Sequence, residues 1–317
     1  MAFPFARAFF SLAALALLSF VASAQAADVT FPTGSKVGMA PPAGFTTSTA
    51  LQGFDDRANS SAILILELPK QAFPEITKAM TAEGLKPQGV TVAKRENVTL
   101  KTGKGIFISG RQEAGGEKMR KWILVAETPE LTAVVTALVP EDAAKVYPDA
   151  AMREAMLSLD VRASVPMEEQ VRTLPFKLED LASLRAFRVA GSTLFLTDGP
   201  KDEIEAAEQP LLVVSAAQGG PGDAAQRDMF ARNLFGSVPG FTDLKVISTD
   251  LIRLSGSQTH QLLAEGKDAK TGDTVKFVQW LRFGNGAFVR FIGVARDEAW
   301  PAAFTRFRTV RDSLAPR

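Results

Sequence analysis

Short apolar runs and alternating apolar and polar residues cover much of the chain, and both patterns predict strands. Two clear runs are "ILILELP" at 63–69 and "PLLVVSA" at 210–216. Most of the predicted strands are separated by short turns, which antiparallel neighbours allow and parallel neighbours do not. We therefore expect largely antiparallel sheets.

One hairpin can be placed in register from the sequence alone. In "RFGNGAFVRF", the Asn-Gly pair at 285–286 suits the two positive φ angles of a type I′ turn. That turn pairs Arg282 with Val289 and Leu281 with Arg290. Since neighbouring residues of a strand point to opposite faces, the two arginines are expected on opposite faces of the sheet.

Helical spacing of apolar residues predicts four helices, each covering a sheet with one apolar face. The first lies near 71–83 and stops at Gly84. Another begins at Asp223, where Gln226 completes a capping-box pattern, and stops at Gly236. One further helix closes each half of the chain. The residues expected to face the sheets are Phe73, Ile76, Met80, Met229, Phe230 and Leu234, and in the closing helices Met152, Met156, Leu159, Phe304, Phe307, Val310 and Leu314.

The order of these patterns occurs twice. Segments 100–142 and 254–298 share a small-residue turn, an apolar strand, a polar loop, a strand around a tryptophan and a further apolar strand. The tryptophans are Trp122 and Trp280, for which core packing is expected. Two copies with a full set of strands and helices are interpreted as a tandem duplication of a domain.

The domain boundaries follow from this repeat. Residues 27–165 are predicted as the first domain and residues 172–317 as the second. Between them, 166–171 is the expected linker, because the surrounding segment mixes charges with Pro166 and Pro175 and has no sustained periodicity.

The "APPAGF" opening, the "ILILELP" strand, the long strand around tryptophan and the closing helix with "SL" resemble the PsbP-like fold. This fold is shared by extrinsic subunits of photosystem II, a Ran-binding nuclear import factor and bacterial envelope proteins of the DcrB type. The resemblance implies an α+β protein of two tandem α/β/α sandwiches, each a mainly antiparallel sheet flanked by helices. It also implies binding or assembly roles without a shared catalytic centre.

The first 26 residues have the pattern of a signal peptide. Arg7 precedes an apolar stretch at 8–21, and small residues follow it. A stretch of about 14 residues is shorter than the roughly 20 that a spanning helix needs. We expect cleavage near Ala27 and a periplasmic or secreted product with no membrane span. No cysteine is present for a lipid anchor, unlike in the lipoprotein members of the family.

Composition narrows the possible chemistry. A hydrophobic fraction of 46% and a charged fraction of 22% indicate a folded protein, not a disordered one. The formal net charge of +1 argues against nucleic-acid binding, which usually needs a basic patch. The absence of cysteine excludes thiol chemistry. We expect no cofactor and no metal.

His260 is the only histidine. It lies in the predicted strand "QTHQLLAE", where the first copy has "GKGIFISG". Catalysis by histidine needs a nucleophile or an orienting acid within hydrogen-bond reach, and a zinc site needs several ligands. No such neighbours are evident in the sequence, so we expect a packed, structural histidine and no catalytic residue.

The two copies differ in their cations. From 28 to 165 there are 10 lysines and 6 arginines, whereas from 172 to 317 there are 6 lysines and 13 arginines. Arginine and aromatic side chains are enriched in protein interfaces. The alternative is a solvated helix face paired with Asp297, Glu298 and Asp312. The candidate partner-binding residues are Arg296, Trp300, Arg306, Arg308 and Arg311.

Three classes of function remain open. The first is a non-enzymatic binding or assembly factor of the bacterial cell envelope, acting by contacts with a protein partner. The second is a periplasmic carrier of a small apolar or anionic ligand, which a large apolar pocket would support. The third is a hydrolase that uses serine, lysine or carboxylates, which a cleft with convergent carboxylates would support.

Overall fold

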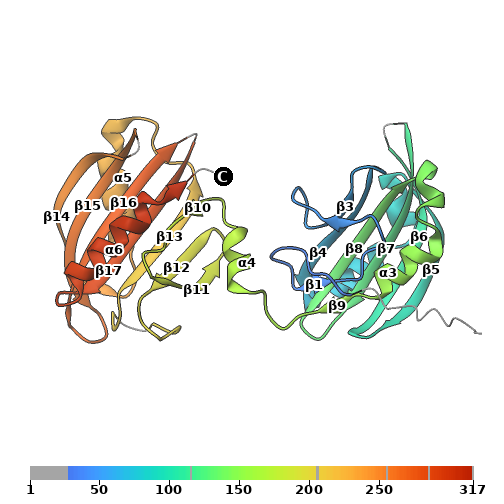
Figure 1. The fold of residues 1–317 in the computed structure, drawn as a ribbon, viewed down its shortest axis with the longest axis horizontal. Helices are drawn as coiled ribbons and strands as arrows, with labels where there is room; N and C mark the ends of the chain where they lie inside the picture. The colour runs from blue at the N-terminus through green and yellow to red at the C-terminus, as the bar shows by residue number, and fades with distance from the viewer. Residues whose placement is uncertain (1–27, 115, 205–206, 255, 285, 316–317) are drawn as a thin grey trace, which may run out of the picture.

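The chain forms two antiparallel seven-stranded sheets with few helices, so it is a sheet-rich α+β protein of two tandem domains (Figure 1). The computed structural model describes residues 28–114, 116–204, 207–254, 256–284 and 286–315. The predicted signal peptide and Asn285 of the predicted turn lie outside the described residues. No described helix is long and apolar enough to cross a membrane.

Both sheets have the same strand order. In the first, the strands from one edge to the other are β2 (Thr46–Thr47), β3 (Gly53–Asp56), β4 (Ser61–Pro69), β8 (Leu131–Pro140), β7 (Glu117–Glu127), β6 (Gly103–Ala114) and β5 (Val90–Leu100). In the second, they are β11 (Arg185–Ala190), β12 (Thr193–Thr197), β13 (Leu211–Gln218), β17 (Ala287–Arg296), β16 (Thr274–Gly284), β15 (Ser257–Asp268) and β14 (Phe241–Leu254). The shared order supports the duplication read from the sequence.

A two-stranded ribbon closes each domain and joins the two ends of its sequence. In the first domain, β1 (Val37–Gly38) pairs with β9 (Asp160–Val161). In the second domain, β10 (Lys177–Leu178) pairs with β18 (Leu314–Ala315).

Helices lie on both faces of each sheet. In the first domain, α1 (Phe73–Ala79) and α2 (Ala82–Leu85) cover one face, and α3 (Asp149–Leu157) packs on the other. In the second domain, α5 (Ala224–Gly236) and α6 (Trp300–Asp312) take these places. A short helix, α4 (Met167–Arg172), occupies the predicted linker. The 3-10 helices are η1 (Lys70–Ala72), η2 (Lys86–Gln88) and η3 (Glu141–Lys145).

The β16–β17 hairpin has the register that the sequence predicts. Leu281 pairs with Arg290 and Arg282 pairs with Val289, which sends the two arginines to opposite faces. Gly286 has a φ of 72°, as the predicted turn requires.

The predicted helix at 71–83 is wrong in its extent. It is divided into α1 and α2, because Thr81 caps a new turn by accepting a hydrogen bond from the Gly84 amide at 3.1 Å. Gly84 therefore lies inside α2 and does not stop the helix.

The prediction that Met229 faces the sheet is also wrong, since its side chain is 64% exposed. Ala231 and Phe235 are the fully buried residues of α5. Met229 lies two residues before Ala231, about 200° around the helix, and so points to solvent. Asp223 caps α5 as predicted, through a hydrogen bond from the Ala225 amide.

Each tryptophan strand forms the centre of its domain's core. Trp122 and Trp280 are 2% and 0% exposed, which confirms the packing role expected for them. Helix α6 approaches β17 closely at Gly293, where a Cβ atom would lie 2.4 Å from the Phe307 ring. A side chain at this position would force the helix away from the sheet.

Candidate functional site

The most developed recess of the second domain is a groove of about 690 Å³ at the end of the β16–β17 hairpin. The closing ribbon supplies one wall, and β13 and the hairpin supply the floor. Its lining residues are Pro175, Phe176, Ser192, Ala216, Ala217, Gln218, Ser257, Arg282, Phe283, Gly284, Ala287, Phe288, Val289, Leu314 and Ala315.

Strand pairing shows which residues of the first domain occupy the matching positions. Leu124 pairs with Val135 in the first domain, as Arg282 pairs with Val289 in the second. On the next strand, Ile65 pairs with Val135, as Ala216 pairs with Val289. Arg282 and Ala216 therefore take the places of Leu124 and Ile65.

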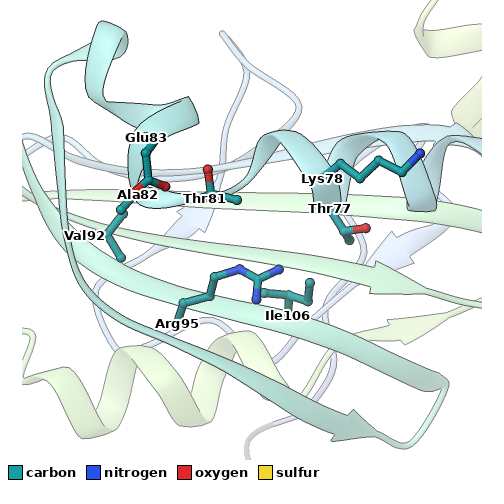
Figure 2. A pocket seen from close by; sticks show the side chains of 8 residues that line it. All are labelled: Thr77, Lys78, Thr81, Ala82, Glu83, Val92, Arg95 and Ile106. Atoms are coloured by element: carbon teal, nitrogen blue, oxygen red, sulfur yellow. The ribbon is translucent and has the colours of Figure 1, made fainter.

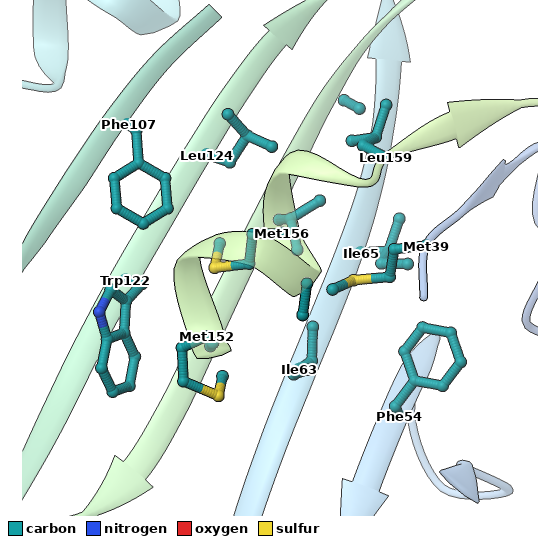
Figure 3. Packing of buried hydrophobic residues seen from close by; sticks show 14 of the residues in the cluster. Met39, Phe54, Ile63, Ile65, Phe107, Trp122, Leu124, Met152, Met156 and Leu159 are labelled. Carbon is teal, nitrogen blue, oxygen red and sulfur yellow. The ribbon is translucent and has the colours of Figure 1, made fainter. Parts of the chain in front are cut away.

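The first domain has no groove at these matching positions, because large apolar side chains fill them. Ile65 and Phe107 are each 4% exposed and Leu124 is 0% exposed. Figure 3 shows them gathered around Met156 of α3, with Leu159 nearby, and all belong to one core cluster. Dense packing of this kind leaves no room for a ligand.

In the second domain the same positions hold smaller or polar residues. Ala216 replaces Ile65, and Arg282 replaces Leu124. Thr259 pairs with Arg282 as Phe107 pairs with Leu124, so a hydroxyl replaces an aromatic ring. These exchanges remove apolar volume beneath the closing ribbon and introduce a cation, which opens the groove.

Arg282 is loosely held. Its Nη1 donates to the Leu314 carbonyl oxygen and its Nη2 to the Ser257 hydroxyl, each over 3.4 Å. These distances exceed the usual 2.7–3.2 Å for N–H···O bonds. Among the described residues, no carboxylate forms an ion pair with Arg282.

A small cavity of about 10 Å³ lies behind Arg282 and is also lined by Thr259, Arg311 and Asp312. The Thr259 hydroxyl is buried there without a hydrogen-bond partner. Asp312 Oδ1 accepts a hydrogen bond from Arg311 Nε at 2.8 Å and forms an ion pair with Arg311 Nη2 at 2.7 Å, so this oxygen is already paired. Arg282 thus separates this cavity from the groove.

Arg290, on the opposite face, is the other arginine introduced by the hairpin. Desolvation by burial lowers its pKa to about 10. Its Nε donates to Gln279 at 2.9 Å and its Nη2 to the Leu234 carbonyl near the C-terminus of α5 at 3.0 Å. A helix C-terminus favours a cation, so Arg290 supports the packing of α5.

The first domain has a hollow of about 550 Å³ between its helices and β5 (Figure 2). Its polar groups bond within the domain: Arg95 donates to the Met80 carbonyl at 3.0 Å, and Thr77 to the Phe73 carbonyl at 2.9 Å. Lys78 pairs with Glu75 at 2.8 Å. Because these groups already have partners, the hollow offers less for recognition than the groove.

The structure distributes the five candidate partner-binding residues over several environments. Arg296 pairs with Asp273 and Arg306 with Asp198, each at 2.9 Å. Both arginines are thus paired, but with acids other than those named in the sequence alternative, of which only Asp312 pairs with a candidate, Arg311.

The other three candidates, Trp300, Arg308 and Arg311, lie on α6. Trp300 stacks on Phe304 with ring centroids 5.2 Å apart, and the Arg308 guanidinium lies 5.1 Å from the same ring. Arg311 is only 8% exposed and lies 4.6 Å from the Trp280 ring, so it stabilises the core side of α6. Trp300 and Arg308 remain accessible on this helix.

His260 is 3% exposed and takes the place of Ile108 in the first domain, since both pair with matching residues of the tryptophan strand. Its Nε2 lies 3.0 Å from Asp228 Oδ1, and its Nδ1 is buried without a partner. The Arg232 hydrogen bond is the main cause that lowers the pKa of Asp228, and His260 adds to it. No group of three or more potential metal ligands occurs among the described residues.

The sequence did not point to the groove. One signal was present, since the position of Arg282 in its hairpin was predicted. When the runs "ILILELP" at 63–69 and "PLLVVSA" at 210–216 are aligned from their first residues, however, Ile65 corresponds to Leu212. The sheet instead matches Ile65 with Ala216. The loss of side-chain volume at this position was therefore hidden.

Comparisons with known proteins give distant structural similarities. No family model and no curated protein matches the chain. LpqN of Mycobacterium tuberculosis, described as involved in cell envelope biogenesis, is 16% identical over 44% of this chain and 83% of its own, with a TM-score of 0.35. The PsbP protein CyanoP of Synechocystis is 11% identical over 39% and 74%, with a TM-score of 0.30.

Another match spans most of the chain. The T6SS immunity protein TplEi of Pseudomonas aeruginosa, solved with an "L" peptide, is 9% identical over 91% of this chain and 97% of its own, with a TM-score of 0.30. All three TM-scores are too low to transfer a fold or a function.

Proposed function

We propose that this protein is an exported, non-enzymatic binding protein of the cell envelope, built from two PsbP-like α/β/α domains. Its second domain holds a protein partner in the groove beside Arg282. The observation that carries this proposal is the replacement of three packed core residues, Ile65, Phe107 and Leu124, by Ala216, Thr259 and Arg282. Ala216 and Arg282 line the groove and Thr259 lines the small cavity behind it, at positions that the first domain fills with packed apolar side chains.

Binding fits the groove better than catalysis does. Its serines, Ser192 and Ser257, have no histidine among the residues that line the groove. His260 lies on the α5 face of the sheet and bonds to Asp228. Acyl transfer by a serine needs a base within hydrogen-bond reach of the hydroxyl, and the lining supplies none.

A small-ligand carrier is the second candidate, favoured by the size of the groove. Its volume of about 690 Å³ lies within the range of small-molecule sites, and Ala216, Val289 and Leu314 contribute an apolar lining. Native mass spectrometry of protein isolated from cells distinguishes this candidate, because a carrier retains a small molecule of defined mass.

The test of protein binding is to fill the groove. Ala216→Ile restores the residue type that the first domain has at the matching position, and Ala82→Leu in the hollow of Figure 2 is the control. Tagged variants are incubated with envelope extract, and captured proteins are quantified by mass spectrometry. We expect Ala216→Ile to deplete specific partners while Ala82→Leu retains them. Equal capture by both variants and the wild type contradicts the proposal.

A further inference from the structure

We infer that the groove recognises the carboxyl terminus of a partner polypeptide whose last side chains are apolar, with Arg282 binding the terminal carboxylate. This inference rests on the proposed function and names the partner's chemistry. Three features carry it: an arginine with free donor capacity, an apolar floor on the same face of the sheet, and a polar rim suited to a peptide backbone.

The charge of Arg282 lacks a counterion within the described residues. Other arginines of the second domain are paired, such as Arg185 with Asp202 at 2.5 Å and Arg306 with Asp198 at 2.9 Å. Asp312, which lines the small cavity behind Arg282, is held by Arg311 at 2.7 Å. A guanidinium has five donors in a planar fork that matches a carboxylate, and two long contacts leave most of them free.

Apolar side chains lie on the same face of the sheet as this cation. Val289 pairs with both Arg282 and Ala216, so the three residues share one face, and Leu314 lies on the closing ribbon. Ala216, Val289 and Leu314 are only partly buried and line the groove. A ligand with a carboxylate and adjacent apolar groups satisfies both parts of the site.

The rim favours a polypeptide over a free acyl chain. Ser192 and Gln218 line the groove and are exposed, and neither side chain forms a hydrogen bond with another described residue. Amides and hydroxyls in these places can bond to the N–H and C=O groups of a peptide backbone, which an acyl chain lacks. Capture of a C-terminal carboxylate is a recurring mode of peptide recognition.

The experiment uses the mature full chain and a pooled library of acetylated hexapeptides. Their last three positions vary among apolar residues, and the library is made once with free carboxyl termini and once as amides. Peptides retained by immobilised protein are identified and quantified by mass spectrometry. Dodecanoate serves as a competitor that has a carboxylate and an apolar chain but no peptide backbone.

Three variants accompany the wild type. Arg282→Leu reproduces the residue that the first domain packs at this position, so it is expected to fold, as circular dichroism verifies. Arg282→Lys keeps the charge and loses the planar fork. Arg57→Leu removes one exposed charge from the first domain as a control.

For the wild type and Arg57→Leu, we expect free acids to be retained at least about tenfold better than the matching amides. Arg282→Leu should bring this ratio close to one, and Arg282→Lys should give an intermediate ratio. Equal retention of acids and amides by the wild type overturns the inference, as does binding of dodecanoate without any peptide. If Ala216→Ile still depletes envelope partners in either case, the proposed function stands and only the carboxylate assignment fails.

Discussion

The two domains build the same sheet but use one region of it differently. In the first, Leu124 is fully buried under α3, whereas in the second the matching Arg282 lies at a groove with loosely held donors. The tryptophan two residues earlier is buried in both copies. The core around the tryptophan strand is therefore maintained in each copy, while the region beneath the closing ribbon is free to diverge.

The largest effect on stability is expected when Leu124 and Arg282 are each replaced by the residue of the other domain. Leu124→Arg buries a cation among apolar side chains without a partner, so we expect it to lower the free energy of unfolding by about 4 kcal/mol or more. Arg282→Leu should change it by about 1 kcal/mol or less, since the site is partly open. Hydrogen exchange measured on peptides from each domain separates the two effects. Similar losses from both changes would mean that the two sites are equally packed.

A second exchange tests the volume of the site. Ile65→Ala should cost about 2–4 kcal/mol by leaving a cavity in the first core. Ala216→Ile should cost about 1 kcal/mol or less, because the groove can accept the larger side chain. Urea unfolding of the full chain gives both values. A large loss from Ala216→Ile would show that the closing ribbon is packed tightly over this position.

The sequence predicted structural features well where residues close together in the chain determine them. The antiparallel hairpin at Arg282 and Val289, the cap at Asp223 and the buried tryptophans follow from turn chemistry, capping and side-chain size, all of which are local. The groove depends on strands far apart in sequence. Ala216 matters only because β13 pairs with β17 in a register that the letters alone do not reveal.

A third prediction concerns the exchange of Ile108 for His260 on the opposite face. His260→Gln should keep a polar contact with Asp228 and change the free energy of unfolding by about 0.5–2 kcal/mol. Capture of partners should remain unchanged, because His260 lies away from the groove. Loss of capture in a variant with an unchanged melting temperature would assign His260 a functional role.

Replacing Arg306 and Arg308 on α6 of the second domain should have a smaller effect, which concerns partner capture. Arg306→Glu with Arg308→Glu should weaken partner capture by about 1 kcal/mol per important contact, because both lie on the outer part of α6. The matched change in the first domain, Lys70→Glu with Lys78→Glu, should have little effect. Titration of an identified partner by calorimetry measures both. Equal weakening would indicate nonspecific attraction between charges.

The smallest effect is the dependence of stability on pH that arises from Asp228 in the second domain. The hydrogen bond from Arg232 holds the pKa of Asp228 below its ordinary 3.8, so its ionised form stabilises the fold above that value. This contribution is lost as the pH falls through the lowered pKa. Melting temperatures of the wild type and Asp228→Asn, measured from pH 6 to pH 2, should converge at the acid end. A constant difference across this range would contradict the assignment.

The closing ribbon of the second domain also sets the order in which the groove can form. Ser313 donates a hydrogen bond to the Asp180 carbonyl across 133 positions, next to the pairing of β10 with β18. Joining segments so distant has a high entropic cost before the new contacts offset it, so such contacts form late. Leu314 and Ala315 of β18 line the groove. A folding intermediate with a paired sheet and an open ribbon would therefore lack a complete groove.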